Sequence, residues 1–332
     1  MTTVPALSFA TSASELVGPI LDGRVEAEGF ELLASVCSPS EIFWRQLHYG
    51  GFDVAEMALP ALLVAREHGI EMVALPAFPA RRFPQVELLA HPDSGIDAPA
   101  DIAGKRFAVV EFAQASMVWT RGILEHDFGV KASSVTWIVE RSDEVSYASA
   151  VGFTPPEGVR VEHMPAGETL RTMLETHQAD VAPAGAPRAL TVVERNRMAS
   201  AGREVAYRPV FDDKAGECRR FFAAHGYIPS NHCYALRADV AREHPAAVSA
   251  LWRALVASKA LADAEQHLPD ALFFDAEYLA RTAADFGDDP YPYGFAANRQ
   301  LLADLIGFCH EQGVIGEAPA PEALFPEELL DT

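Results

Sequence analysis

The sequence predicts an α/β protein in which mostly parallel sheets are flanked by helices. Short apolar segments typical of strands alternate with amphipathic segments of helical periodicity along most of the chain. A chain of 332 residues is too long for one simple core and suits two domains. The pattern changes near His91, after which a second α/β unit fills about residues 93–206.

The first part of the chain follows a strand, loop and helix pattern. A helix start is marked by Ser38, by Pro39 in the first turn and by Glu41 inside it. We expect strands at residues 4–9, 30–35, 52–57, 71–77 and 86–90, and helices at residues 15–21, 42–49 and 60–68.

The second part repeats this alternation and ends in helices. We expect strands at residues 107–110, 135–139, 161–164, 179–182 and 232–236. Helices are expected at residues 115–128, 168–177, 245–265, 274–282 and 297–311, whereas residues 142–158 look irregular. Gly129 is a suitable end for the first of these helices. The apolar stripes on the last helices predict a buried face.

Composition and charge exclude several classes of protein. Lys plus Arg number 26 and Asp plus Glu number 47, so the net charge of −21 disfavours nucleic acid and anionic membrane surfaces as partners. No apolar run is long enough to span a bilayer. The first residues show neither the basic nor the apolar region of a secretory signal, which favours a cytoplasmic protein.

Familiar motifs of metal, nucleotide and serine chemistry are missing from the sequence. The four cysteines are widely spaced and are expected to be reduced, and no Cys/His metal pattern occurs. G-x-S-x-G, H-E-x-x-H, P-loop and G-x-G-x-x-G motifs are also missing. The sequence therefore disfavours serine hydrolases, zinc proteases, NTPases and dinucleotide enzymes.

An ordered set of short stretches covers the chain from about residue 7 to 315. They are Leu21-Asp22-Gly23-Arg24-Val25, Phe52-Asp53-Val54-Ala55-Glu56-Met57, Phe78-Pro79-Ala80-Arg81-Arg82-Phe83, Asp101-Ile102-Ala103-Gly104-Lys105-Arg106, Val118-Trp119-Thr120-Arg121-Gly122-Ile123-Leu124 and Asp289-Pro290-Tyr291-Pro292-Tyr293-Gly294. Together they resemble the 4,5-dihydroxyphthalate decarboxylase family.

This resemblance implies a two-lobed clamp like the type II periplasmic binding proteins. Residues 1–92 and 207–332 would form domain 1, with the C-terminal helices, and residues 93–206 would be the inserted domain 2. Two crossover strands would act as a hinge, with the ligand in the cleft between the domains. Helix N-termini that face such a cleft favour a small anionic ligand.

The resemblance also implies a cofactor-free and metal-free lyase of aromatic compound catabolism. Its reaction would remove CO2 from a hydroxylated aromatic acid. A para hydroxyl pushes electrons toward the carbon that bears the carboxylate, and a general acid then protonates that carbon. Such a site needs the acid, a cationic partner for any second carboxylate and an aromatic wall.

Three residues are candidates for the proton transfer. His232 begins a predicted strand at a place where the family shows a histidine, although a lone histidine is often structural. Glu56 lies near the end of the predicted strand 52–57, where helix capping is the competing interpretation. Glu111 directly follows the predicted strand 107–110 and is an equal candidate for the acid or the base. The sequence does not divide the roles among them.

Three arginines are candidates for substrate binding, because a guanidinium can bind a carboxylate through two hydrogen bonds. Arg81 and Arg82 lie in a loop expected at the hinge, where the competing interpretation is a solvated surface pair. Arg121 lies within a predicted helix and could instead form a structural salt bridge.

Two serines and a tryptophan complete the predicted binding residues. Ser116 lies near the start of a helix, where it could bind an anion or cap the helix. Trp119 could stack on a ring or belong to the core. Ser12 lies in the loop Ala10-Thr11-Ser12-Ala13-Ser14, whereas the family is rich in aromatic and charged residues there. This difference leaves the exact substrate open.

Two other functions remain open at this stage. The same clamp without chemistry would be a solute-binding protein for a small anionic ligand, and a different small-molecule enzyme could use the same fold. The sequence also leaves the oligomeric state open, and a homo-oligomer is one of the alternatives.

Overall fold

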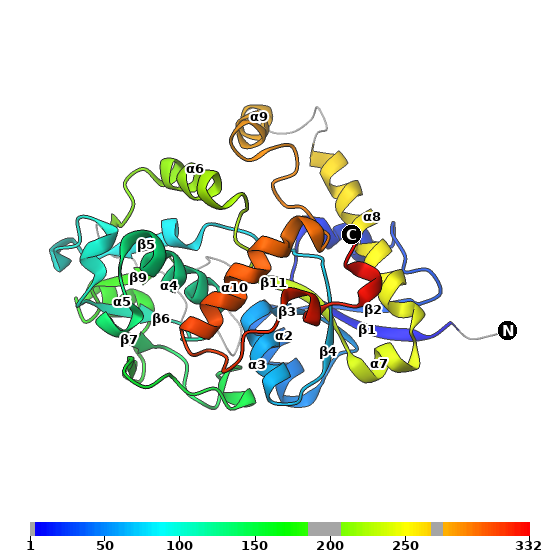
Figure 1. The fold of residues 1–332 in the computed structure, drawn as a ribbon, viewed down its shortest axis with the longest axis horizontal. Helices are drawn as coiled ribbons and strands as arrows, with labels where there is room; N and C mark the ends of the chain where they lie inside the picture. Colours follow the sequence, from blue (N-terminus) through cyan, green and yellow to red (C-terminus); the bar gives the residue numbers. More distant parts are fainter. Residues whose placement is uncertain (1–3, 185–206, 267–274) are drawn as a thin grey trace.

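The computed structural model of the chain describes residues 4–184, 207–266 and 275–332, which form two sheets flanked by helices (Figure 1). The first sheet has the order β2-β1-β3-β11-β4. Its strands are β1 (Ala6–Thr11), β2 (Glu31–Val36), β3 (Val54–Ala58), β4 (Met72–Leu75) and β11 (His232–Arg237). Strands β2, β1 and β3 are parallel, and β11 runs antiparallel between β3 and β4.

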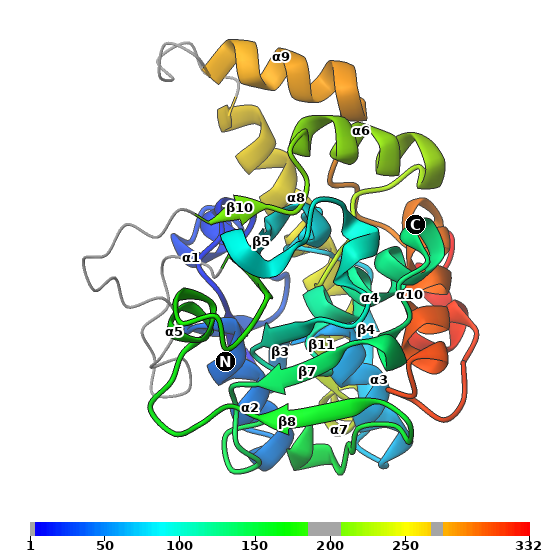
Figure 2. The ribbon, with the colours of Figure 1, turned by 90° about the vertical axis from the view of Figure 1, so that its left-hand side faces the viewer.

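The second sheet has the order β10-β5-β9-β6-β7-β8 among the described residues. Its strands are β5 (Leu88–Ala90), β6 (Arg106–Val109), β7 (Thr136–Val139), β8 (Arg160–His163), β9 (Val181–Pro183) and β10 (Arg208–Pro209). Strands β9, β6, β7 and β8 are parallel, whereas β5 and β10 are antiparallel to their neighbours. Figure 2 shows β7 and β8 side by side at the front of this sheet.

The chain passes into the second sheet at β5 and leaves it after β10. Both strands therefore belong to the second sheet, although they lie outside the interval 93–206 that the sequence assigns to domain 2. The exact division at residues 92 and 206 stays a prediction, and residue 206 itself lies outside the described residues.

Helices pack on both faces of the first sheet. Taken over all the described residues, the helices in chain order are α1 (Gly18–Leu21), α2 (Pro39–Tyr49), α3 (Leu59–Glu67), α4 (Ala115–Phe128), α5 (Leu170–Glu175), α6 (Lys214–His225), α7 (Ala238–Glu243), α8 (Ala246–Gln266), α9 (Asp275–Phe286) and α10 (Arg299–Glu311). Alternate residues of β11 point to opposite faces, as a strand requires. Cys233 packs in the core with α2 and α3, while Tyr234 packs in the core with α8.

Helix α10 lies across the middle of the molecule in Figure 1 and packs against α4. Gly122 on α4 makes this approach close, because a Cβ there would lie 2.2 Å from the ring of Phe308. Gln312, just after α10, donates to the carbonyl of Val118 and accepts from Arg121. These contacts fix the C-terminal segment against the helix that follows β6.

Most predicted elements lie close to their observed bounds, but α6, α7 and β10 were not predicted. Helix α6 buries only Glu217 and Phe221, so it has almost no apolar stripe for a periodicity argument to detect. Its ends are nevertheless marked. Asp213 accepts a hydrogen bond from the amide of Gly216, and Gly226 ends the helix with a φ of 77°. The predicted helix start at residue 274 lies outside the described residues.

Candidate functional site

The best-formed group of titratable side chains is the pair of Glu56 and His232. Glu56 lies in β3 and His232 is the first residue of the antiparallel neighbour β11. In the register of these strands Glu56 faces Tyr234, so His232, two residues earlier, lies on the same face of the sheet. The Nδ1 atom of His232 is 2.6 Å from Oε1 of Glu56. The structure thus brings two of the three predicted catalytic residues into contact.

The other carboxylate oxygen of Glu56 is held by the loop after β1. Its Oε2 atom accepts hydrogen bonds from the amide and the hydroxyl of Ser12, both at 2.7 Å. The hydroxyl of Thr11 is 2.8 Å from that of Tyr234, which adds a polar contact beside the pair. Because β1 and β3 are parallel neighbours, the end of β1 meets Glu56 directly. The small residues of this loop allow that close approach.

The surroundings of Glu56 favour its ionised form. Burial raises the pKa of this carboxyl, but the bond and charge of His232 together with the two bonds from Ser12 outweigh it, so the pKa of Glu56 lies below its usual value. An ionised Glu56 makes Nδ1 of His232 the donor of the shared bond. The second ring nitrogen, Nε2, then remains for proton exchange on the other side of the ring.

Aromatic side chains connect His232 with the second sheet. The ring of Phe43 on α2 lies edge-on to His232, with centroids 5.0 Å apart, and edge-on to Tyr147 at 5.6 Å. Tyr147 belongs to the loop after β7. The indole nitrogen of Trp44 also donates to the carbonyl of Glu144 in this loop, at 3.3 Å. The loop of residues 141–149 therefore contacts the helix whose Phe43 packs against His232.

Glu111, the third predicted catalytic residue, lies in a separate network after β6. Its Oε2 atom is 2.7 Å from Nη1 of Arg141, and its Oε1 atom accepts from the hydroxyl of Ser146 and from the amide of Ala148. Both members of the ion pair are buried. Arg141 also donates to the hydroxyl of Ser40 at 2.7 Å, which joins this network to the first turn of α2.

Two of the predicted ligand-binding arginines are bonded inside the protein. Arg81 donates to the carbonyls of Ile228 and Pro292 and to the side chain of Asn298, and burial lowers its pKa to about 10. Arg121 donates to Gln312 and to the carbonyl of Phe112, and burial lowers its pKa to about 9. These contacts hold the loop at residue 81 and helix α4 in place. A ligand contact of either arginine stays a prediction.

Arg82 and Ser116, in contrast, line the same small cavity, of about 30 Å³, near the start of α4. Glu87 lines it as well and lies 3.4 Å from Nη1 of Arg82. Burial raises the pKa of the Glu87 carboxyl. Trp119 lies deeper, fully buried, and donates to the carbonyl of Ser230 at 2.8 Å. The side chain of Arg82 is 39% exposed, whereas Arg121 is buried and Arg81 is bonded within the protein.

The sequence did not single out Tyr234, Phe43, Glu87 or Arg141. Arg141 lies two residues beyond a predicted strand, the same signal that selected Glu111, and could have been found in this way. Phe43 and Tyr234 are aromatic residues in apolar segments, where nothing in the sequence separates a core role from a site role. Among residues 4–184, 207–266 and 275–332 no cluster of His, Cys, Asp and Glu could hold a metal ion.

Solved structures define the class of protein. The periplasmic aliphatic sulphonate binding protein SsuA from Escherichia coli matches 99% of this chain and 100% of its own, with a TM-score of 0.54 and 12% identity. The desulfurization enzyme DszB matches 98% of both chains with a TM-score of 0.51 and 14% identity. The chain therefore has the fold of the periplasmic binding proteins, as the sequence predicts. In its described part no helix is long and apolar enough to cross a membrane.

Sequence comparisons define the family. The NMT1/THI5 like family model matches residues 38–267. A 4,5-dihydroxyphthalate decarboxylase of Pseudomonas putida is 34% identical over 52% of this chain and 68% of its own length. Another, from Comamonas testosteroni, is 28% identical over 98% of both chains. The chain belongs to the NMT1/THI5-like family, and its similarity to these 4,5-dihydroxyphthalate decarboxylases confirms the resemblance found in the sequence.

Proposed function

We propose that this protein is a decarboxylase that releases CO2 from a hydroxylated aromatic acid similar to 4,5-dihydroxyphthalate. The observation that carries the proposal is the hydrogen-bonded Glu56–His232 pair of the first sheet, in a chain whose relatives are named for this reaction. The cofactor-free reaction, the role in aromatic compound catabolism and the cytoplasmic location expected from the sequence belong to the same proposal.

The reaction needs one proton at carbon and one electron pair from the ring. Loss of the phenolic proton para to the carboxylate pushes electrons toward the carbon that bears it. That carbon takes a proton from the enzyme, the ring loses its aromatic character, and the C–C bond to the carboxylate then breaks. The bond electrons restore the aromatic ring, and the former carboxylate leaves as neutral CO2.

In this proposal His232 supplies the proton through Nε2. The ionised Glu56 stabilises the imidazolium and holds the ring in one orientation, while Ser12 fixes Glu56. The side chain of His232 is 14% exposed, so its proton can be replaced from solvent when the cleft is open. Ser12 then acts as a positioning residue with its hydroxyl on Glu56.

The carboxylate that remains on the ring needs a cationic partner. We assign this role to Arg82, whose side chain is 39% exposed and lies with Ser116 near the start of α4. The amides of that helix start add positive potential for an anion. Arg81 and Arg121 would support the site from within, since their guanidinium groups are bonded to the protein. Glu111 would support it through Arg141.

A solute-binding protein is the second candidate function. It is favoured by the fold shared with the sulphonate-binding protein SsuA and by the small residues of the loop around Ser12, which differ from the family pattern. Such a protein would bind a small anionic ligand in the same cleft without chemistry. Buried groups such as the Glu56–His232 pair would then only contact the ligand.

The deciding experiment is incubation of the purified protein with 4,5-dihydroxyphthalate and related hydroxylated aromatic acids. CO2 release and the ligand-induced thermal shift are measured together, with and without a metal chelator. Release of CO2 that the chelator does not reduce supports the proposal. A thermal shift without CO2 supports a binding protein. If neither signal occurs with any acid of the series, the proposed substrate class is wrong. Cell fractionation tests the location.

A further inference from the structure

A second cavity, of about 460 Å³, lies entirely within residues 111–163, at the ends of the parallel strands β6, β7 and β8. Its volume is within the range of small-molecule sites. Glu56 and His232 do not line it, and neither does any other residue of the first sheet. This cavity, which we call the 111–163 pocket, therefore does not include the Glu56–His232 pair.

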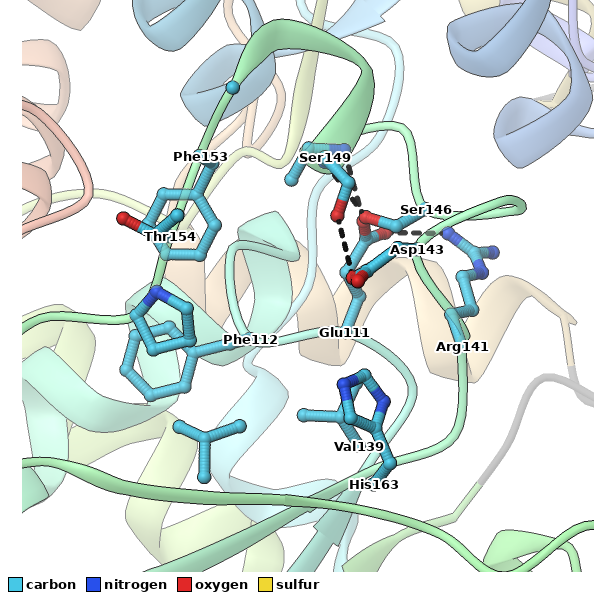
Figure 3. A pocket seen from close by; sticks show the side chains of 14 residues that line it. Glu111, Phe112, Val139, Arg141, Asp143, Ser146, Ser149, Phe153, Thr154 and His163 are labelled. Carbon is cyan, nitrogen blue, oxygen red and sulfur yellow. Dashed lines mark hydrogen bonds and ion pairs between the residues drawn. The ribbon is translucent and has the colours of Figure 1, made fainter.

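One wall of the 111–163 pocket is aromatic. The rings of Phe112 and Phe153 are nearly parallel, at an angle of 12° with centroids 6.1 Å apart (Figure 3). Phe112 is held from within the protein, because the guanidinium carbon of Arg121 lies 3.8 Å from its centroid and Trp137 packs edge-on to it. Val139 and Val161 continue the apolar surface. A flat aromatic ring is the ligand that such a wall binds best.

The opposite wall is polar, and it has more acidic than basic side chains. Figure 3 shows Asp143, Ser146, Ser149 and Glu111 together on this side. Asp143 is exposed and accepts one bond, from the hydroxyl of Ser149 at 3.2 Å. The carboxylate of Glu111 is engaged by Arg141, Ser146 and Ala148. Asp143 is thus the carboxylate best placed to accept a hydrogen bond from a ligand.

The balance of charge selects among aromatic ligands. Two carboxylates, Glu111 and Asp143, face this wall with one guanidinium, Arg141, which already bonds Glu111 and Ser40. An aromatic carboxylate would place a further negative charge beside Asp143, whereas a phenolic hydroxyl can donate to it. The imidazole of His163 lines the same pocket and offers a second polar partner.

We propose that the 111–163 pocket binds a neutral hydroxylated aromatic molecule, of the phenol or catechol class. The ring lies against Phe112 and Phe153, and a hydroxyl donates to Asp143. The preference is thus opposite to that proposed for the cleft, where a carboxylate is required. This inference does not depend on the decarboxylase activity, because binding is measured without turnover.

The test is titration calorimetry of the full chain with catechol, whose ring carries two hydroxyls, and with phthalate, whose ring carries two carboxylates. Catechol is expected to bind at least about tenfold more tightly than phthalate at this pocket. Asp143→Asn is expected to weaken catechol binding about tenfold, because it removes a charged acceptor. Phe153→Leu, which keeps an apolar side chain, is expected to weaken it roughly threefold or more.

Two variants locate the binding event. Glu162→Gln removes a charge from the same strand, β8, at a residue that does not line the pocket, and should leave catechol binding unchanged. His232→Asn should also leave it unchanged, since His232 lies outside the pocket. The inference is overturned if catechol does not bind at millimolar concentration. It is also overturned if neither Asp143→Asn nor Phe153→Leu weakens catechol binding to the folded protein, or if His232→Asn abolishes that binding.

Discussion

Glu56 and Glu111 are two buried carboxylates with almost the same set of partners. Glu56 lies within β3 of the first sheet, and Glu111 lies two residues after β6 of the second. Each accepts from a serine hydroxyl, from a backbone amide and from a basic side chain. They differ in the basic partner, which is His232 for Glu56 and Arg141 for Glu111. An imidazole can give up its proton near neutral pH, whereas a guanidinium cannot.

The difference in the basic partner predicts a catalytic role for the Glu56–His232 pair and a structural role for the Glu111–Arg141 pair. The Glu56–His232 pair can deliver and recover a proton, and its histidine is partly exposed. In the second pair, Arg141 also reaches Ser40 on α2, so the Glu111–Arg141 pair ties the loop after β7 to the helix beside the site. The comparison predicts that changes at the first pair reduce activity and that changes at the second reduce stability.

The largest effect is expected on the activity of the histidine variant. His232→Asn removes the proposed acid while keeping a polar side chain, and should lower the rate of CO2 release by about 10²–10⁴-fold. Circular dichroism should show an unchanged fold. His244→Asn, at a partly exposed histidine after α7, is the matched control and should keep full activity. If His232→Asn is as active as the control, His232 does not deliver the proton.

The second-largest effect is expected on the stability of the Glu111→Gln variant. Glu111→Gln removes the carboxylate charge that lies 2.7 Å from the buried guanidinium of Arg141, and should lower the free energy of unfolding by about 3–5 kcal/mol. Urea unfolding measures this loss. The exposed Glu162→Gln should change it by less than about 0.5 kcal/mol. Equal stability of the two variants would remove the structural role that the comparison gives to Glu111.

A smaller effect is expected for the serine that holds Glu56. Ser12→Ala removes one donor to Oε2 but keeps the amide bond, and should reduce activity roughly tenfold. The two bonds from Ser12 help lower the pKa of Glu56, so that pKa should rise in the variant. The loss of activity on acidification should then begin at a higher pH than in the wild type.

The pH profile separates positioning from a general loss of structure. Ser14→Ala lies in the same loop, where the hydroxyl of Ser14 accepts from the amide of Leu16, and should leave the profile unshifted. A Ser12→Ala variant with reduced activity and an unshifted acid limb would mean that Ser12 does not act through Glu56.

The sequence predicted the alternation of strands and helices because apolar periodicity reflects burial directly. It also named Glu56 and His232 individually. It did not show that they touch, because their contact depends on the antiparallel pairing of β3 with β11, which are more than 170 residues apart in the chain. For the same reason the sequence could not show the hydrogen-bond partners that Arg81 and Glu111 have inside the protein. Their partners, Asn298 and Arg141, are brought to them by tertiary packing.

A third cluster, around Asp180, sharpens the comparison because it combines both kinds of partner. Asp180 is bonded to Arg106 and also lies 3.0 Å from Nε2 of His177. The ring of His177 stacks on that of His91, with centroids 4.0 Å apart. Partial burial and then the neighbouring His177 lower the pKa of His91 below its usual value. The folded protein therefore favours neutral His91.

The smallest predicted effect follows from this lowered pKa. As the pH falls below about 6.5, His91 takes up a proton in the unfolded chain before it does so in the folded one. The stability that His91 contributes is present above that pH and is lost as the pH falls toward the folded-state pKa. His91→Phe keeps an aromatic ring but cannot titrate, so its melting temperature should fall less than that of the wild type between about pH 7 and 5. His310→Gln, at an exposed histidine near the end of α10, controls for the loss of any histidine and should follow the wild type. Parallel curves for wild type and His91→Phe would show that the stacked histidines do not sense pH.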